Sequence, residues 1–296
     1  MKSGFVTIVG KPNVGKSTLI NNILNNKISI VSSKPATTRI KVLGIYNSEE
    51  GQIIFIDTPG MEEGRNQLGK FMQKMILSSL EETDLILFLI DARGWREEDE
   101  KILEILKKTG KKIILVINKV DLLKEKEILL PLIEESMERH NFVEVIPISA
   151  LKKKNIDRLI KSIFTYLPEG EQLYPSDMIT NLPLEYKISE IIREKVLNKT
   201  YQEVPQEVSV EVEEIREGQK KKDIIFISAN IIVERDNLKG IIIGKNGEKI
   251  KKIGQLAREE IEILLGKKVF LQLKVKVIKD WRNRPDVFRR FGYGEI

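Results

Sequence analysis

Short, unbroken apolar runs recur through the first 165 residues and constrain the fold of this chain most strongly. Five of them lie at residues 5–9, 53–56, 85–90, 113–117 and 145–148. None alternates with polar residues, so each is typical of a strand that is buried on both faces of a sheet. Segments with helical spacing of apolar residues separate them. This order predicts an α/β, doubly wound parallel sheet, in which ligands bind at the carboxyl ends of the strands.

The pattern changes after residue 167 and predicts a second domain. The sequence Leu-Pro-Glu-Gly at 167–170 ends a helix, and Pro175 and Pro183 bracket a stretch without clear periodicity. Beyond it the expected order is a helix (184–198), two strands (206–216 and 223–235), a helix, a second helix (248–265) and a strand (268–279). We therefore expect a first domain at 1–170, a linker at 171–182 and an α+β domain at 183–296 with a basic C-terminal tail.

The composition excludes several classes of protein. Because the 296 residues include no Cys, disulfides and thiolate metal sites are ruled out. No apolar stretch reaches the roughly 18 residues of a transmembrane helix, and we expect a soluble, cytoplasmic protein. The net charge is +6, and residues 239–252 carry five Lys against one acid, Glu248. This local basic segment is typical of a surface that contacts phosphates.

The clearest motif reads G-K-P-N-V-G-K-S over residues 10–17 and matches the phosphate-binding pattern G-x-x-x-x-G-K-[ST]. It follows a predicted strand and opens a predicted helix, as the pattern requires. Backbone N–H groups and the helix N-terminus attract phosphate oxygens, Lys16 supplies a positive charge, and the Ser17 hydroxyl supplies a ligand for Mg²⁺. The residues expected around the phosphates are Gly10, Lys11, Pro12, Asn13, Val14, Gly15, Lys16, Ser17, Thr18 and Gly60.

A second motif, D-T-P-G over residues 57–60, ends the run at 53–56. Asp57 at this edge of the sheet is expected to hold Mg²⁺ through a water molecule, and the Gly60 N–H to reach the γ-phosphate. The polar loop upstream offers a second hydroxyl ligand, for which we favour Thr38. Thr37 is the alternative, and an exposed Thr pair without a metal role is a further one. The expected switch segment is Asp57, Thr58, Pro59, Gly60 and Met61.

A third motif, N-K-V-D over residues 118–121, follows the run at 113–117 and predicts selection of guanine. Asp121 can accept hydrogen bonds from N1–H and the 2-amino group of guanine, whereas adenine would leave the carboxylate unpaired. This argues against an ATPase or kinase. Asn118 can bond N7, and the Lys119 stem can cover the base. The segment Ser149, Ala150 and Leu151 offers a backbone N–H to guanine O6.

The three motifs together resemble the translation-factor-like GTPases, and NVGKS with TTR and DTPGM is similar to the Era group. Most small GTPases place a Gln that orients the attacking water after D-x-x-G, whereas this chain has Met61. An apolar side chain cannot polarise water, so we expect slow intrinsic turnover. In related GTPases with an apolar substitution, a matching Asn binds K⁺ beside the phosphates. The resemblance therefore implies Asn13 as a K⁺ ligand.

The second domain contains G-K-N-G over residues 244–247, between two predicted helices. The helix-strand-strand-helix-helix-strand order around it resembles a type II KH domain, whose G-x-x-G loop clamps four nucleotides. The resemblance implies an RNA surface of Gly244, Lys245, Asn246, Gly247, Lys249 and Lys252, which Arg282 and Arg284 extend.

One P-loop GTPase domain followed by one KH domain is the architecture of the Era group. The resemblance implies GTP and GDP binding, Mg²⁺, contact with the 3′ region of 16S ribosomal RNA, and a role in assembling the small ribosomal subunit. It also implies a peripheral contact with the cytoplasmic face of the membrane, and we expect a monomer. A second interpretation stays open, in which recognition of another RNA or partner is the function and hydrolysis is only a slow reset.

Overall fold

The computed structural model describes residues 1–32, 34, 37–61, 64, 66–124, 128–200, 207–218 and 223–294. The chain divides into two compact units. The first comprises Met1–Ser29, Thr38–Glu63 and Phe71–Asn181, and the second comprises Ile30–Thr37, Gly64–Lys70 and Leu182–Ile296. The main division therefore falls one residue before the expected start of the second domain. The two short segments that belong to the second unit were not expected from the sequence.

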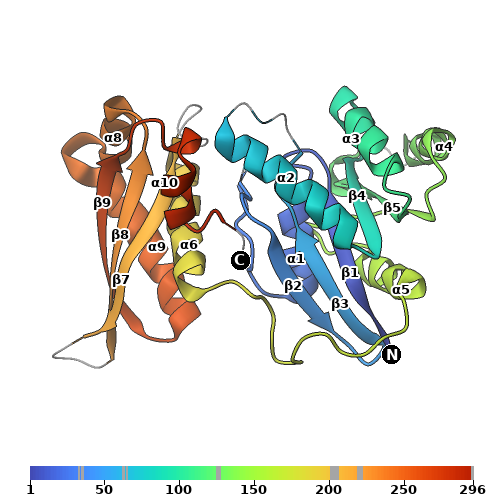
Figure 1. The fold of residues 1–296 in the computed structure, drawn as a ribbon, viewed down its shortest axis with the longest axis horizontal. Coiled ribbons are helices and arrows are strands. Elements are labelled where there is room, and N and C mark those ends of the chain that lie inside the picture. Colours follow the sequence, from blue (N-terminus) through green and yellow to red (C-terminus); the bar gives the residue numbers. More distant parts are fainter. Residues whose placement is uncertain are drawn as a thin grey trace. The chain divides into compact units, whose positions relative to one another are not determined.

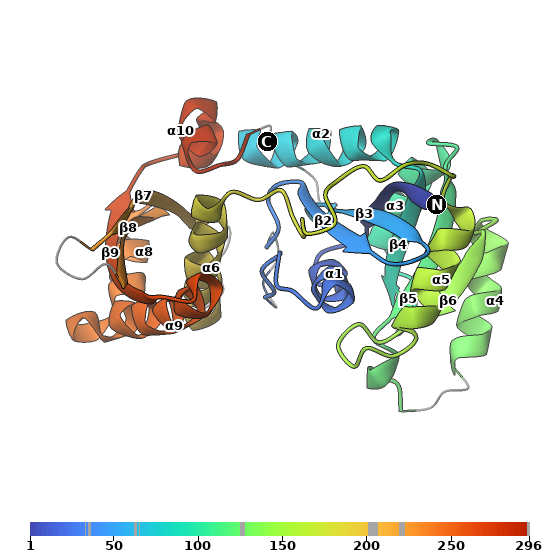
Figure 2. The ribbon, with the colours of Figure 1, turned by 90° about the horizontal axis from the view of Figure 1, so that it is seen from below.

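The first unit contains a six-stranded sheet with helices on both faces (Figures 1 and 2). Its elements are β1 (Lys2–Val9), α1 (Lys16–Leu24), β2 (Val42–Asn47), β3 (Gly51–Asp57), α2 (Gln67–Glu82), β4 (Leu85–Asp91), α3 (Glu97–Lys107), β5 (Lys112–Asn118), the 3₁₀ turn η1 (Val120–Leu122), α4 (Leu129–Arg139), β6 (Glu144–Pro147) and α5 (Ile156–Tyr166). The strand order is β2-β3-β1-β4-β5-β6, and only β2 runs antiparallel to its neighbour. The α/β doubly wound prediction is confirmed.

The five predicted strands are β1, β3, β4, β5 and β6. All residues of β3 and β4 are buried, as the apolar runs at 53–56 and 85–90 predict. Helices α2, α3 and α4 share one apolar cluster with β4 and β5, in which Ile76, Leu103 and Leu132 pack with Phe88 and Leu115. The parallel strands β1, β3 and β5 end at the same edge of the sheet, and the three motifs lie at those ends. Strand β2, the antiparallel edge strand, was not predicted from the sequence.

The second unit contains a three-stranded sheet, β7-β8-β9. Its elements are α6 (Leu184–Lys199), β7 (Ser209–Glu217), β8 (Ile224–Val233), α8 (Asp236–Ile243), the 3₁₀ turn η3 (Lys245–Gly247), α9 (Glu248–Leu265), β9 (Lys268–Val277), the 3₁₀ turn η4 (Trp281–Asn283) and α10 (Pro285–Arg290). Strand β8 pairs antiparallel with β7 and parallel with β9. This helix-strand-strand-helix-helix-strand order is the one predicted for an α+β type II KH domain.

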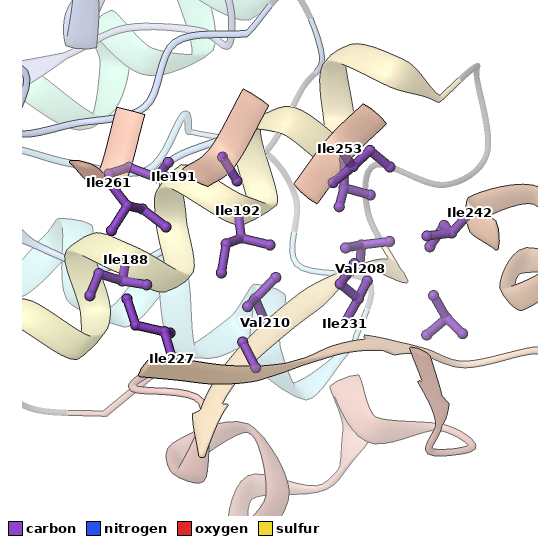
Figure 3. Packing of buried hydrophobic residues seen from close by; sticks show 14 of the residues in the cluster. Ile188, Ile191, Ile192, Val208, Val210, Ile227, Ile231, Ile242, Ile253 and Ile261 are labelled. Carbon is purple, nitrogen blue, oxygen red and sulfur yellow. The ribbon is translucent and has the colours of Figure 1, made fainter. Parts of the chain in front are cut away.

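The core of the second unit lies between this sheet and the helices α6, α8 and α9. Figure 3 shows Ile188 and Ile192 of α6 and Ile261 of α9 directed toward Ile227 and Ile231 of β8. Alternate residues of β8 and β9 therefore face the helices, as the period of a strand requires, and the residues between them form the outer face of the sheet. The C-terminal segment covers one end of that face.

No helix within the described residues is both long and apolar enough to cross a membrane.

Candidate nucleotide site and nucleic-acid loop

The phosphate-binding motif forms the turn between β1 and α1. Lys16 is the first residue of α1, and its buried ammonium donates hydrogen bonds to the carbonyl oxygens of Gly10 (2.9 Å) and Lys11 (3.1 Å). These bonds hold the charge across the mouth of the loop. The Lys16 ammonium is therefore a fixed positive charge beside the loop, as binding of the β- and γ-phosphates of a nucleotide requires.

Gly15 requires the absence of a side chain. Its φ of 108° lies in the left-handed region, and a Cβ atom there would lie 2.3 Å from Nδ2 of Asn118. Asn118 Nδ2 also donates to the carbonyl oxygen of Val14 at 2.8 Å. The phosphate loop is therefore packed directly on the end of β5, which carries the N-K-V-D motif.

Two of the expected phosphate residues have side chains engaged elsewhere. Lys11 Nζ lies 2.5 Å from the buried carboxylate of Asp99 in the first turn of α3. Pro12 has no N–H to donate, and it packs against Gly60 of the D-T-P-G segment. Lys11 could therefore reach a phosphate through its backbone N–H, and Pro12 contributes packing.

The three expected Mg²⁺ residues converge. The Ser17 hydroxyl lies 3.1 Å from the Thr38 hydroxyl and donates to Asp57 Oδ2 at 2.9 Å. The alternative, Thr37, uses its hydroxyl to donate to the carbonyl oxygen of Lys34 at 2.7 Å. The geometry therefore favours Thr38 over Thr37.

The surroundings of Asp57 fit a cation. Its carboxylate is fully buried, and Oδ1 has no hydrogen-bond partner within the described residues. Burial raises the pKa of Asp57, an effect that the positive charge of Lys16 and the hydrogen bond from Ser17 oppose. A buried, unpartnered carboxylate oxygen beside two hydroxyl groups is a suitable setting for Mg²⁺ and its water ligands, because this ion takes oxygen ligands and keeps several waters.

The remainder of the D-T-P-G-M segment is fixed by packing. Thr58 Oγ1 donates to the carbonyl oxygen of Ile8 at 2.8 Å and is fully buried. Met61 packs against the apolar cluster that includes Ile76 and Phe88. Its side chain is thus committed to an apolar surface, which agrees with the expectation that it does not orient water.

The base-recognition residues are linked to one another. Asn118 Oδ1 accepts a hydrogen bond from the Ala150 N–H at 2.9 Å, so the same side chain ties the phosphate loop to the 149–151 segment. Asp121 lies on the surface, and its Oδ1 accepts from the buried Ser149 hydroxyl at 2.5 Å. The side chain of Leu151 is exposed, so this residue can serve a base only through its backbone.

Asp91 was not among the predicted site residues, although it holds Lys119. Its carboxylate ends β4 and lies 3.1 Å from Lys119 Nζ, which also donates to the carbonyl oxygen of Asn13 at 2.7 Å. Burial alone would raise the pKa of Asp91, but hydrogen bonds from Arg93 and Lys119 hold it well below its usual range. Asp91 therefore stays charged and fixes the Lys119 stem. In the sequence, the position of Asp91 at the end of a buried strand could have indicated a role in the site.

The G-K-N-G loop joins α8 to α9. Gly244 caps α8 with a φ of 73°, and a Cβ atom there would lie 2.7 Å from Lys249 Cβ. Lys245 and Asn246 are exposed, and Lys249 follows in the first turns of α9. Lys252 is exposed too and bonds the side chain of Gln255 at 3.2 Å. The loop therefore presents its backbone and a cluster of ammonium groups to solvent, as binding of a phosphate backbone requires.

Arg282 does not extend this surface. Its side chain is only 19% exposed and pairs with Glu234 at 2.6 Å and Glu207 at 3.6 Å. These carboxylates neutralise it and fix the chain after β9, which corrects the expectation that it contacts RNA. Arg284 is half exposed, with Asp286 at 3.4 Å.

Both domains match known protein families. Residues 5–119 match the family model described as 50S ribosome-binding GTPase, and residues 203–282 match the KH domain model. The chain is 51% identical to GTPase Era of Aquifex aeolicus over 299 residues, which span 99% of each protein. The chain belongs to the Era family of GTPases.

Solved structures of the Era family share the whole fold. A variant of Aquifex aeolicus Era bound to GDP and aluminium fluoride is 51% identical, with a TM-score of 0.97 over 100% of both chains. Era in complex with MgGDPNP and nucleotides 1506–1542 of 16S ribosomal RNA is 50% identical, with the same TM-score and coverage. Like other Era family members, this chain is a GTPase with a KH domain.

Proposed function

We propose that this chain is a GTP-dependent switch that binds the 3′ region of 16S ribosomal RNA and acts in assembly of the small ribosomal subunit. The observation that carries the proposal is the contact of the Ser17 hydroxyl with both Thr38 and Asp57. One residue of the phosphate loop thus contacts a residue from each of the two segments that must respond to the γ-phosphate.

Mg²⁺ is the metal that these residues fit. Ser17 and Thr38 would bind it directly, and Asp57 would hold one of its water ligands. When bound, the ion neutralises charge on the β- and γ-phosphates. Thr38 would then be held at the nucleotide only while a γ-phosphate is present, which gives the chain two states.

The division of the chain into units supports coupling between nucleotide and RNA. Thr37 belongs to the second unit and Thr38 to the first, so the boundary falls inside the loop that carries the metal ligand. Within the second unit, the buried guanidinium of Arg193 on α6 donates to the carbonyl oxygen of Thr37 and pairs with Glu190 at 2.7 Å. Thr38 is therefore bonded along the chain to a residue whose carbonyl oxygen α6 of the KH domain holds.

The RNA contact rests on the G-K-N-G loop and on the relative that was solved with nucleotides 1506–1542 of 16S ribosomal RNA. Lys245, Lys249 and Lys252 supply the phosphate contacts, and Arg284 adds a further exposed charge. We infer that this chain binds the corresponding RNA segment through the same loop. Monomeric state, cytoplasmic location and a peripheral membrane contact stay predictions.

Hydrolysis needs a group that replaces the missing Gln. Asn13 is exposed beside the phosphate loop, at the mouth of the site. We propose that its side chain binds K⁺ there, so that the ion supplies positive charge where negative charge develops in the transition state.

We expect single-turnover GTP hydrolysis to be about ten-fold faster or more in potassium buffer than in sodium buffer. Asn13→Gly should remove the difference, because Gly accepts the left-handed φ of 59° at this position without strain. Equal rates in both salts for the unsubstituted chain would exclude the potassium role.

The same assay tests the wider proposal when the 3′ fragment of 16S ribosomal RNA is added. Turnover that rises with the RNA supports an enzyme that RNA regulates. Turnover unaffected by an RNA that binds supports the alternative, in which RNA recognition is the function and hydrolysis is a slow reset.

A further inference from the structure

The outer face of the KH sheet carries a stacked ladder of three side chains at the end nearest the β7–β8 connection. Phe226 of β8 and Phe270 of β9 are directly paired in register, and their rings lie 5.5 Å apart with an interplanar angle of 13°. Arg216 of β7 pairs with Phe226, and its guanidinium lies over the ring at 4.3 Å from the centroid. We call Arg216, Phe226 and Phe270 the stacking ladder.

The stacking ladder lies in the open part of this face. At the other end, Ser209 donates to the hydroxyl of Tyr293, Arg290 pairs with Glu211 at 2.9 Å, and Asn230 and Ile232 are fully buried. Phe270, in contrast, is 58% exposed. A cross-strand aromatic pair stabilises a sheet by only about 0.2–1 kcal/mol, and that role does not require a ring this open to solvent.

The charge around the stacking ladder is mixed, and one Lys of β9 has no ion pair among the described residues. The outward positions of β9 are Lys268, Phe270, Gln272, Lys274 and Lys276, which include three ammonium groups and no acid. Acidic neighbours offset most of this charge, because Lys276 pairs with Glu213 at 2.7 Å, Arg216 with Glu214 at 3.0 Å and Lys268 with Glu262 at 3.4 Å. Within the described residues, Lys274 is the outward Lys of β9 that remains without an ion pair.

Exposed aromatic rings on a strand, flanked by Lys and Arg, suit a single-stranded nucleic acid. Bases stack on the rings and on guanidinium planes, while the ammonium groups follow the phosphate backbone. Because outward residues on one strand recur about every 6.6 Å, the Lys of β9 form a line beside the rings. An apolar peptide would meet the rings but would leave Lys274 without a partner.

We propose that the stacking ladder is a second RNA contact, which binds unpaired bases of the same RNA that the G-K-N-G loop holds. The inference rests on the proposed function, since it requires that the chain bind RNA. The two contacts are separate: α9 has 18 residues, so about 27 Å lies between the loop at its first turn and the region near its last turn. They also lie on opposite faces of the sheet. Two contacts on one RNA raise its affinity by making the second an intramolecular event.

The test measures the affinity of the full chain for the 3′ fragment of 16S ribosomal RNA. Since a stacked base contributes about 1–3 kcal/mol, we expect Phe270→Leu to weaken binding about five-fold or more. Phe270→Tyr and Phe270→Trp should bind like the unsubstituted chain, because both keep an aromatic face. An RNA of about four nucleotides, which fills only the loop, should bind Phe270→Leu normally.

Two further variants separate this inference from the proposed function. Ile263→Ala removes another exposed apolar side chain of the same domain and should leave RNA affinity and melting temperature unchanged. Lys249→Ala should weaken the short and the long RNA alike. Full affinity of Phe270→Leu for the long RNA would overturn the stacking inference while Lys249→Ala still supports the loop. Equal losses for Leu, Tyr and Trp would also overturn it, and an unsubstituted chain that binds neither RNA would overturn both proposals.

Discussion

Replacing Asp121 by Asn is expected to lower GTP affinity about 100-fold or more and to transfer preference to xanthosine triphosphate. The carboxylate accepts hydrogen bonds from guanine N1–H and the 2-amino group, and each bond to a charged group contributes about 1.5–3 kcal/mol. An Asn at this position presents an N–H group toward the 2-amino group, whereas xanthine offers a carbonyl oxygen there. The donor pattern is thereby reversed.

The measurement is competition of GTP, xanthosine triphosphate and ATP against a labelled guanine nucleotide. Asp157→Asn, an exposed substitution of the same type in the first turn of α5, is the matched control and should leave all three affinities unchanged. Because Asp121 lies on the surface and Ser149 holds it by one hydrogen bond, the fold should tolerate the change. Unaltered GTP affinity in Asp121→Asn would contradict the assignment of the guanine site.

Lys16→Met is expected to slow GTP hydrolysis about 100-fold or more. The Lys16 ammonium is buried at the phosphate loop and fixed by the carbonyl oxygens of Gly10 and Lys11. A prearranged charge at a water-poor site stabilises the transition state strongly, and loss of one such group typically costs 10²–10³-fold in rate. Met has a similar length and retains the apolar packing of the stem.

Single-turnover hydrolysis at saturating GTP measures this effect, with the thermal melting temperature as a check on folding. Lys152→Met, on the exposed loop after β6, is the matched control and should hydrolyse GTP normally. Hydrolysis by Lys16→Met within a few-fold of the unsubstituted rate would place the catalytic charge elsewhere in the site.

Local sequence patterns were sufficient to predict much of the fold and the residues of the motifs. The apolar runs at 53–56 in β3 and 85–90 in β4 are uninterrupted, and the N-K-V-D and G-x-x-x-x-G-K-S motifs each lie at the carboxyl end of such a strand. Edge strand β2 was missed because Gly44 and the polar end at Asn47 interrupt its apolar pattern. An unbroken apolar run thus gives a clear signal, even at the other edge strand β6, whereas the interrupted sequence of β2 does not.

Contacts between residues distant in sequence were not predictable. Lys11 and Asp99 are 88 positions apart, and Arg282 and Glu234 are 48 apart. Sequence patterns report periodicity and local motifs, and neither indicates which opposite charges meet after folding. For that reason the ion pairs of Arg282 and the role of Asp91 beside Lys119 were not predictable from the sequence.

The coupling of nucleotide state to RNA binding is tested most directly by measuring RNA affinity in the two nucleotide states. The dissociation constant for the 3′ fragment of 16S ribosomal RNA is determined with GDP and with a non-hydrolysable GTP analogue. We expect tighter binding with the analogue by about 5–150-fold, the usual range for coupled sites, and the RNA should raise affinity for the analogue by the same factor. Equal RNA affinity in the two nucleotide states would show that the GTPase domain does not gate the KH domain, and it would contradict the proposed switch.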